Sequence, residues 1–262
     1  MQTLSTNLVQ LEIKKRTATI WINRPDKRNA LNPEVVEGLK EAVRISRDAA
    51  EVKIILLKGR GDVFCAGADL AVIKALKSAT YEENLADSES LGELFSMITS
   101  CPKPVIAAVH GHAIAGGCGL ATVCDLVIAA ESAKFGYTET RIGFVPAMVA
   151  RYLIKKTGET RARHLLFTGG LISATEAERI GLISQVAPDD TFEESVKKLV
   201  NTLLSKTSGE ALNATKKLMN EVSDMPADEA LKLAASVNAR ARGTEDCQKG
   251  ISAFLNKEKI EW

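Results

Sequence analysis

Two glycine-containing loops are the parts of this sequence whose residue types and spacing could perform chemistry. The stretch AIAGGCGLATVCD (113–125) places Gly116, Gly117 and Gly119 between two apolar runs. The stretch VFCAGADL (63–70) also places a glycine after an apolar, strand-like run. Glycine commonly marks a tight turn or a close approach of two backbones. Two such loops after two different strands can aim one backbone N–H each at a single point, which is the arrangement of an oxyanion hole.

Glu139 is the candidate acid or base to work beside such a hole. It lies in the stretch FGYTETRIGFVP (135–146), among aromatic and aliphatic residues. A carboxylate next to an oxyanion hole can remove or return a proton alpha to a carbonyl group. A glutamate in a loop is more often solvated surface, but the apolar surroundings favour the catalytic interpretation.

Other interpretations of these stretches are weaker. The run that starts at Gly117 breaks the dinucleotide-binding fingerprint at Thr122, and the sequence has no phosphate-binding loop motif, so a structural turn is the main alternative. His110 and His112 could bind a metal as a pair, yet no third ligand has suitable spacing, and we expect no metal site. Cys118, near the start of the expected helix, has no base close in sequence, so core packing is the preferred interpretation.

Composition excludes several classes of partner. The chain has 262 residues, of which 45% are hydrophobic, and its net charge is +1 from 34 basic and 33 acidic residues. This balance gives no reason to expect nucleic acid or a membrane surface as a partner. The first residues, MQTLSTNLVQLEIKK, contain no apolar signal region, and five scattered cysteines form no CxxC pair. We therefore expect reduced thiols and a cytoplasmic or organelle-matrix protein.

The elements that must position the two loops alternate between strands and helices. LVQLEIKK and TATIWIN predict a β-hairpin that turns at Lys14–Arg16. NPEVVEGLKEAVRISRDAA predicts a helix with Asn32 as its N-cap, and TYEENLADSESLGELFSMI predicts another that opens with a capping box of Thr80 and Glu83. Strands of the type VKIILLKG, PVIAAV and DLVIAA lie between such helices, so we expect βαβ units and a parallel sheet.

The character of the chain changes near residue 190. We expect an α/β core over residues 1–190 and a helical region over residues 191–262. The C-terminal region predicts three or four helices and no strand, and its helices are expected at 191–206, 208–222, 226–242 and 244–257. No linker rich in glycine or serine separates it, so we expect it to pack on the core or on a neighbouring subunit.

Six motifs in order resemble the crotonase superfamily, also called the enoyl-CoA hydratase/isomerase family. They are INRPDKRNALN, FCAGADL, PVIAAVHGHAIAGGCGLATVCDLVIAAESAKFG, ETRIGFVP, LLFTGGLISATEAERIGLISQVAP and GISAFLNKEK. The resemblance covers nearly the whole chain. It implies a crotonase-type α/β spiral of ββα units, with a C-terminal helical region that makes trimer contacts in a homotrimer or a dimer of trimers.

The resemblance also implies roles for individual residues. The N–H groups of Ala66 and Gly116 would form the oxyanion hole for a thioester oxygen, with Glu139 as acid or base. Asp69 matches a family aspartate, for which we prefer a loop-bracing role. No metal or redox cofactor is implied, because CoA arrives as part of the substrate. The residues implied to bind CoA are Lys27, Arg28, Ala68 and Lys257, the last of them from an adjacent subunit.

Two departures from the family pattern concern the acyl group. Hydratases of the family carry a second glutamate where this chain has Gly119, and they have glycines where this chain has PAMVARYL (146–153). One interpretation is an altered acyl pocket, lined by Gly119 and Ala147, in which the missing side chain leaves space. The other is that hydration by a pair of glutamates is lost.

Several reactions fit these residues. Family frequency favours enoyl-CoA hydration, whereas a lone carboxylate at Glu139 is sufficient for double-bond isomerisation through an enolate. A decarboxylase of malonyl-type CoA in the same family is a further alternative. A non-catalytic trimer that binds acyl-CoA or RNA is an alternative from another class, and an acid/base residue at position 139 argues against it.

Overall fold

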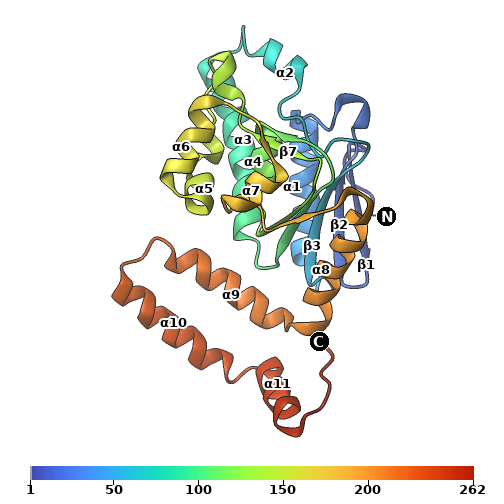
Figure 1. Cartoon of the computed structure of the whole chain (residues 1–262), viewed down its shortest axis with the longest axis vertical. Coiled ribbons are helices and arrows are strands. Elements are labelled where there is room, and N and C mark those ends of the chain that lie inside the picture. Colours follow the sequence, from blue (N-terminus) through green and yellow to red (C-terminus); the bar gives the residue numbers. More distant parts are fainter. Residues whose placement is uncertain (1) are drawn as a thin grey trace.

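The computed structural model describes residues 2–262, which build two β-sheets surrounded by helices (Figure 1). Within that range the larger sheet has six strands in the order β1-β2-β3-β4-β6-β9, and the smaller sheet has three in the order β5-β7-β8. The strands are β1 (Val9–Lys14), β2 (Thr17–Ile22), β3 (Ile54–Gly59), β4 (Val105–Val109), β5 (Ala113–Ile114), β6 (Leu126–Ala130), β7 (Lys134–Gly136), β8 (Ile172–Ser173) and β9 (Gln185–Ala187).

Helices fill most of the remaining chain. The α-helices are α1 (Pro33–Asp48), α2 (Leu70–Ala75), α3 (Tyr81–Ser100), α4 (Gly116–Thr122), α5 (Ala147–Thr157), α6 (Glu159–Thr168), α7 (Ala174–Arg179), α8 (Phe192–Lys206), α9 (Gly209–Val222), α10 (Ala227–Ala241) and α11 (Glu245–Asn256). The described residues also form three short 3-10 helices, η1 (Pro25–Lys27), η2 (Glu139–Ile142) and η3 (Asp189–Thr191).

The predicted hairpin and parallel sheet are confirmed. Strands β1 and β2 pair antiparallel, and Lys15 and Arg16 join them with φ values of 48° and 62°. Two consecutive residues with positive φ give a turn whose twist matches that of the strands. The other pairings of the larger sheet are parallel. The carboxyl ends of these strands therefore meet at one edge of the sheet.

The two helix starts predicted from capping residues are also confirmed. The side chain of Asn32 accepts a hydrogen bond from the Val35 N–H at the start of α1. At the start of α3, Thr80 and Glu83 form the reciprocal capping box. Each cap satisfies backbone N–H groups that have no partner within the helix.

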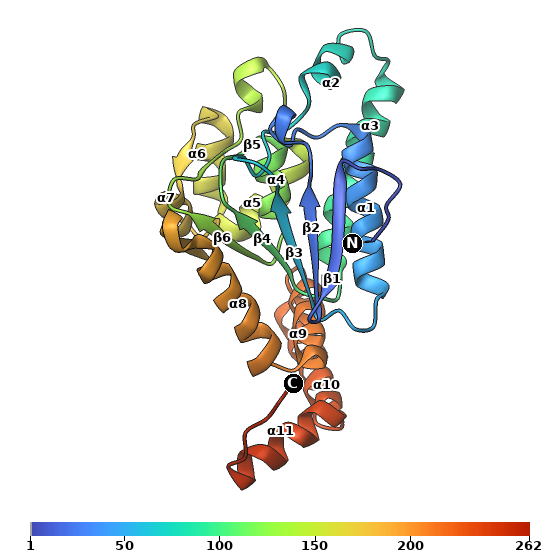
Figure 2. The same ribbon diagram turned by 90° about the vertical axis from the view of Figure 1, so that its right-hand side faces the viewer.

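Alternate residues of the larger sheet face two different helical layers. In β3, Ile55 and Leu57 belong to the core shared with α1 and α3. Ile54 and Leu56 point the other way and pack with Phe192 of α8. Figure 2 shows α1 and α8 on opposite sides of the sheet. Because both faces are covered, the central strands β4 and β6 are continuously apolar, as expected for a parallel sheet.

The C-terminal helices α9, α10 and α11 extend away from the sheets (Figure 1). Helix α9 is anchored by Lys216, whose ammonium group donates to Asp125 Oδ2 at 2.7 Å and to the carbonyl oxygens of Ile98 and Lys103. Of the described residues of α11, one is buried, and it is Ala253. The division of the chain at 190/191 into two domains stays a prediction. Helix α8, the first helix after this boundary, packs on the larger sheet.

Candidate active site

Glu139 stands out chemically among the described residues. It begins η2, directly after β7, and its side chain is half-buried. In residues 2–262, Glu139 Oε2 is the one buried side-chain polar atom without a hydrogen-bond partner. Burial raises the pKa of this carboxyl group above its ordinary value. A half-buried carboxylate with one buried, unpartnered oxygen and a raised pKa is suited to accept and return a proton.

The second loop (residues 110–116) brings a backbone amide close to Glu139. Strand β5 of this loop pairs parallel with β7, with Ile114 opposite Gly136. Gly116 follows β5 by two residues, and Glu139 follows β7 by three. Both groups therefore emerge from the carboxyl ends of two paired parallel strands. Gly116 is the first residue of α4, so its N–H has no acceptor within the helix.

The first loop (residues 63–69) lies directly against the second. The Cys65 N–H donates to the carbonyl oxygen of His112 at 3.2 Å, and the Cys65 carbonyl accepts from the Ile114 N–H at 3.0 Å. Gly67 has a φ of 91°, and a Cβ atom on it would lie 2.9 Å from the Ala115 Cβ atom and 3.4 Å from the Gly116 nitrogen. The glycine is required because the backbones approach closely here.

The structure corrects the expected donor on the first loop. The Ala66 N–H is already used, because it donates to the Arg28 carbonyl oxygen at 3.1 Å. Ala68 is flanked by two bonds to Leu31, which donates to the Gly67 carbonyl and accepts from the Asp69 N–H. Within residues 2–262, no acceptor is bonded to the Ala68 N–H itself. In a regular extended segment, the N–H groups of residues 66 and 68 would face the same side. The positive φ at Gly67 breaks this pattern, so these two N–H groups face different sides.

Asp69 braces the first loop, as expected. One carboxylate oxygen accepts from the Ala71 N–H at 2.6 Å, which caps α2, and the other pairs with the Arg24 guanidinium group. These bonds, with the Ala71 N–H first, lower the pKa of Asp69. The Arg24 side chain also donates to the Ala30 carbonyl oxygen at 3.2 Å. Arg24 is therefore a structural cation here, because both of these bonds tie it to the first loop and its neighbouring backbone.

Three of the four residues expected to bind CoA lie at the surface on or beside the first loop. The side chains of Lys27 and Arg28 are exposed, and the Arg28 carbonyl is joined to the loop through Ala66. Ala68 is exposed as well. Lys257 lies at the end of α11, and Figure 2 shows α11 at the opposite end of the molecule from α2. Within one chain, Lys257 is thus remote from the two loops, and its role in CoA binding stays a prediction.

The structure also corrects the expected acyl space at Gly119. A Cβ atom on this glycine would lie 3.0 Å from the ring of Phe95 and 3.6 Å from Val149. Phe95 is 1% exposed, and it makes an edge contact with the Tyr152 ring at a centroid distance of 6.4 Å. The space left by the missing side chain is filled by Phe95, so Gly119 is part of the core. Ala147, the other residue of the expected pocket, is exposed at the start of α5.

Exposed apolar side chains follow Glu139 along the chain. Ile142, Phe144 and Val145 are 69%, 51% and 69% exposed, and Met148 adjoins them at 37%. Contiguous apolar residues at the surface usually mark a binding site. This segment is therefore the part of the structure next to Glu139 that offers apolar contact to a ligand.

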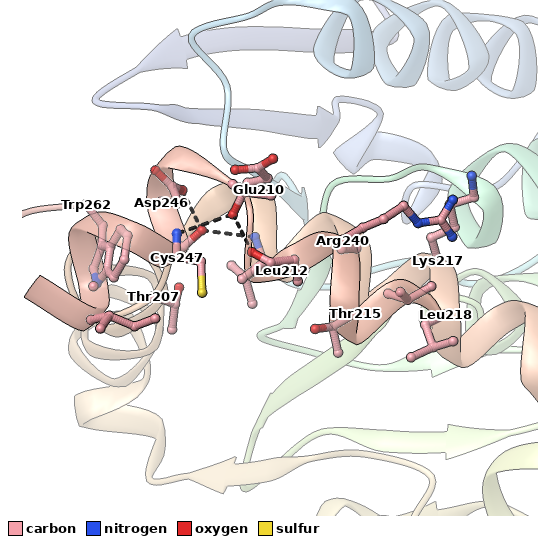
Figure 3. Close-up of a pocket in the computed structure, with 18 of the residues that line it drawn as sticks. Thr207, Glu210, Leu212, Thr215, Lys217, Leu218, Arg240, Asp246, Cys247 and Trp262 are labelled. Atoms are coloured by element: carbon pink, nitrogen blue, oxygen red, sulfur yellow. Dashed lines mark hydrogen bonds between the residues drawn. The ribbon is translucent and has the colours of Figure 1, made fainter. Parts of the chain in front are cut away.

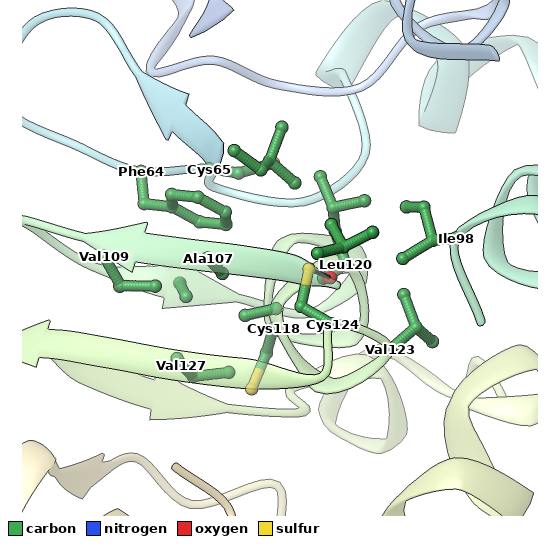
Figure 4. Packing of buried hydrophobic residues seen from close by; sticks show 14 of the residues in the cluster. Phe64, Cys65, Ile98, Ala107, Val109, Cys118, Leu120, Val123, Cys124 and Val127 are labelled. Atoms are coloured by element: carbon green, nitrogen blue, oxygen red, sulfur yellow. Dashed lines mark hydrogen bonds between the residues drawn. The ribbon is translucent and has the colours of Figure 1, made fainter. Parts of the chain in front are cut away.

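The cysteines near the loops are core residues. Burial raises the pKa of the Cys65 and Cys118 thiols to about 12. Figure 4 shows Cys118 and Leu120 of α4 in one packed cluster with Cys65. His110 Nε2 lies 2.7 Å from the Gly61 carbonyl oxygen. In the part of the chain that the structure describes, no group of three His, Cys, Asp or Glu residues is arranged to hold a metal ion.

A large cavity of about 870 Å³ lies away from these groups, between α9, α10 and α11. Figure 3 shows Leu212, Leu218 and Trp262 along it. Ser208 and Asp246 form a hydrogen bond at its wall. None of the loop residues or Glu139 lines this cavity, so its size does not make it the active site. No helix among the described residues has the length and apolar character needed to cross a membrane.

Comparison with known proteins shows similarity over nearly the full length. The sequence profile of a family described as enoyl-CoA hydratase/isomerase matches residues 12–262. The crotonyl-CoA hydratase of Syntrophomonas wolfei is 38% identical over 255 residues, which cover 96% of this chain and 96% of the relative. The short-chain-enoyl-CoA hydratase of Clostridium acetobutylicum is 32% identical over 261 residues and 97% of each chain.

Solved structures agree with the sequence matches. The crystal structure of an enoyl-CoA hydratase from Shewanella pealeana superposes with a TM-score of 0.92 at 28% identity, over 98% of this chain and 97% of the other. An enoyl-CoA hydratase from Bacillus anthracis gives a TM-score of 0.91 at 28% identity, over 98% and 99% of the two chains. The crotonase-type fold expected from the sequence is thereby confirmed.

Proposed function

Because this chain belongs to the enoyl-CoA hydratase/isomerase family, we propose that Glu139 is the acid/base that moves protons on its substrate. The chain is an enzyme that acts on enoyl-CoA thioesters. The single observation that carries the assignment to Glu139 is its buried, unpartnered Oε2 atom beside the two joined loops. A carboxylate that gives up solvation in this way has its pKa raised toward neutral pH, where acid/base catalysis is efficient.

The oxyanion hole consists of the N–H groups of Ala68 and Gly116. Both amides have no backbone acceptor among the described residues, and they come from loops joined at Cys65. During reaction the thioester oxygen gains negative charge as an enolate forms. Donors that are fixed before the reaction stabilise this charge without reorganising, and the loss of one donor typically costs about 3–4 kcal/mol.

In hydration, a water oxygen attacks C3 of a 2-enoyl thioester while Glu139 accepts the water proton. The electron pair moves through C2 to the thioester oxygen, where the two amides hold it. Glu139 then returns its proton to C2, and the 3-hydroxyacyl thioester is complete. The names of the relatives from Syntrophomonas wolfei and Clostridium acetobutylicum, both hydratases, support this reaction.

Isomerisation is the second candidate, and the packing around Gly119 favours it. Glu139 removes a proton from C2 of a 3-enoyl thioester and returns it to C4, so that the double bond moves to position 2. This reaction needs one carboxylate and no positioned water. Phe95 fills the space in which a second carboxylate would stand, so a single acid/base is the natural consequence.

CoA is the part of the substrate that the remaining residues bind. The exposed cations Lys27 and Arg28 lie beside the first loop, where they can meet phosphate groups. Ala68 contacts the thioester end. Lys257 is remote within one chain, so it reaches CoA from a neighbouring copy in a homotrimer or a dimer of trimers. The apolar segment around Phe144 and Ala147 faces the acyl chain, and the reaction uses no metal or redox cofactor.

The test is turnover of crotonyl-CoA and of a 3-enoyl-CoA by the wild type, Glu139→Gln and Glu131→Gln. Glu131 is an exposed glutamate on a turn, so its variant controls for a Glu→Gln substitution made away from the proposed active site. We expect Glu139→Gln to lose about 10²–10⁴-fold in kcat, the scale of a positioned acid/base, with thioester affinity retained. Glu131→Gln should keep the wild-type rate. A Glu139→Gln enzyme of near-wild-type rate would remove Glu139 from the reaction, and binding of CoA thioesters without any turnover would favour a non-catalytic protein.

A further inference from the structure

Tyr137 is a fully buried tyrosine on the segment that ends in Glu139. It follows Gly136, the last residue of β7, and precedes Glu139 by two positions. Its exposed fraction is 0%, and its hydroxyl oxygen lies 2.5 Å from Thr122 Oγ1, at the end of α4. A buried hydroxyl group usually has a partner that fixes its direction.

The direction of this hydrogen bond follows from the next one. Thr122 Oγ1 lies 2.7 Å from the Cys118 carbonyl oxygen, and a carbonyl can only accept. The Thr122 hydroxyl proton is therefore used on Cys118, and the Tyr137 O–H donates to Thr122 Oγ1. Burial keeps the pKa of Tyr137 well above its ordinary value, so the phenol stays protonated and remains a donor. Chains of aligned hydrogen bonds in a low-dielectric interior strengthen one another.

Helix α4 is thus attached to the β7 segment at both of its ends. At its start, the Ala115 N–H donates to the Gly136 carbonyl oxygen at 2.7 Å. At its end, Thr122 accepts from Tyr137. The two attachment points are seven residues apart, which is about 10 Å along a helix. One attachment would leave the helix free to tilt, whereas two set both its position and its orientation.

We infer that Tyr137 is a positioning residue, whose hydroxyl group holds α4, and with it the Gly116 N–H, in a fixed orientation relative to the Glu139 carboxylate. The inference rests on the proposed roles of Glu139 and Gly116. Helix α4, which carries the Gly116 N–H, and the segment that carries Glu139 then belong to one hydrogen-bonded unit. The acid/base and one oxyanion donor keep their separation without a direct contact between them.

The decisive variant is Tyr137→Phe, which removes the hydroxyl group and keeps the ring in the core. Misplacement of a reacting group by about 1 Å can cost about 10²-fold in rate, and we expect a partial effect of about 10-fold in kcat with little change in KM. Thr122→Val removes the other partner of the same bond and should give a similar loss. The double variant should lose no more than either single variant, because both remove one interaction.

A matched control separates positioning from general loss of stability. Ser46 is fully buried in α1, and its hydroxyl donates to the Ala42 carbonyl oxygen at 2.7 Å, away from both loops. Ser46→Ala should lower the thermal midpoint and leave kcat unchanged. A second measurement is the infrared carbonyl stretch of a bound enoyl-CoA, which moves to lower frequency when the oxyanion donors polarise it. That shift should be smaller in Tyr137→Phe than in wild type and Ser46→Ala.

The outcomes are distinct. A lower kcat and a smaller carbonyl shift in Tyr137→Phe, absent from Ser46→Ala, support the inference. A Tyr137→Phe enzyme with wild-type kcat and shift overturns it while Glu139→Gln remains inactive, and so does an equal loss in Ser46→Ala. If Glu139→Gln keeps the wild-type rate, the proposed function fails, and the inference fails with it.

Discussion

The first and second loops each supply one backbone amide to the proposed oxyanion hole, yet they are held in place by different forces. Polar side chains hold the first loop: Asp69 pairs with Arg24, and the buried Asn29 side chain donates to the carbonyl oxygens of Arg60 and Val63 at 2.8 and 2.7 Å. The second loop continues into α4, which is buried from Gly117 to Thr122. The comparison teaches that one half of the proposed oxyanion hole depends on polar side chains and the other on packing.

The loops meet where glycines allow their backbones to touch. A Cβ atom on Gly117 would lie 2.2 Å from the Cys65 carbonyl oxygen, so α4 lies directly against the first loop. Gly67 makes the corresponding approach from the first loop toward Ala115. The distance between the Ala68 and Gly116 amides is therefore set by direct contact between the two backbones. Substitutions can disturb this contact itself, the first loop or the second loop.

The largest effect is expected from Gly67→Ala, because it disturbs both loops at once. The φ of 91° costs a residue with a side chain about 1–2 kcal/mol, and the new methyl group would lie 2.9 Å from Ala115 Cβ. We expect kcat to fall about 10²-fold, since the loops must separate. Steady-state kinetics and thermal unfolding measure the two effects.

Gly158→Ala is the matched control for Gly67→Ala. Gly158 has a φ of 79°, but no atom lies within 4 Å of the position of its Cβ. This variant carries the backbone strain without the loop contact, so it should lower stability and leave kcat intact. Equal kcat in Gly67→Ala and wild type would show that loop contact does not set the amide positions.

Asp69→Asn tests the polar bracing of the first loop. The variant loses the charged partner of Arg24, and charge-assisted hydrogen bonds typically contribute about 1.5–3 kcal/mol to the free energy of unfolding. Because the folded pKa of Asp69 is lowered, this stabilisation is present above the unfolded pKa of about 3.9 and is lost as pH falls through the folded pKa.

Urea unfolding of wild type and Asp69→Asn across about pH 3–7 would measure the difference in their free energy of unfolding. This pH range includes the ordinary pKa of an aspartate, about 3.9. The gap between the two proteins should be largest near neutral pH and shrink in acid. Asp26→Asn changes an exposed aspartate on η1 and should show no such gap. A gap that does not depend on pH would mean that Asp69 acts through packing alone.

Gly119→Glu tests the packing that holds the second loop. If a missing second carboxylate were what limits hydration, this variant would gain hydration of crotonyl-CoA, but the structure places the Phe95 ring 3.0 Å from the first new atom. We expect destabilisation of about 1–3 kcal/mol from overpacking, and no gain in the ratio of hydration to isomerisation. Thermal unfolding and product analysis with both substrates measure these effects.

Gly209→Glu is the corresponding control at another helical glycine. Its Cβ atom would lie at an ordinary 3.5 Å from the Lys53 side chain, in the first turn of α9, where an acidic residue is favourable. This variant should be neutral or stabilising. If Gly119→Glu were as stable as Gly209→Glu and hydrated crotonyl-CoA faster than wild type, the closed packing described here would be wrong.

Local signals in the sequence predicted the elements well. The caps at Asn32 and Thr80 are short-range hydrogen bonds, and both were confirmed. The hairpin follows from two adjacent strand-like runs, and the parallel sheet follows from strands that alternate with helices along the chain; both were confirmed as well. Glu139 was singled out because apolar neighbours surround it in sequence, and the structure places it half-buried. The bracing role of Asp69 was also found correctly.

The misplaced site residues depend on contacts between distant segments. Whether the Ala66 or the Ala68 amide is available depends on Arg28 and on the positive φ of Gly67, neither of which a motif reports. The space over Gly119 is filled by Phe95, a residue of α3 that lies 24 positions earlier in the chain. Tyr137 was seen only as part of the apolar surroundings of Glu139, because its hydrogen bond to Thr122 exists only once β5 and β7 pair.

The central claim is that one carboxylate beside two backbone amides forms an enolate, and hydrogen exchange at C2 of butyryl-CoA in D₂O tests it most directly. A saturated thioester can be neither hydrated nor isomerised, so exchange reports only on proton removal and enolate stabilisation. We predict exchange by the wild type at a rate that rises with pH through the raised pKa of Glu139, and exchange about 10²–10⁴-fold slower in Glu139→Gln. Equal exchange in the two proteins, with CoA-thioester binding intact in both, would contradict the account.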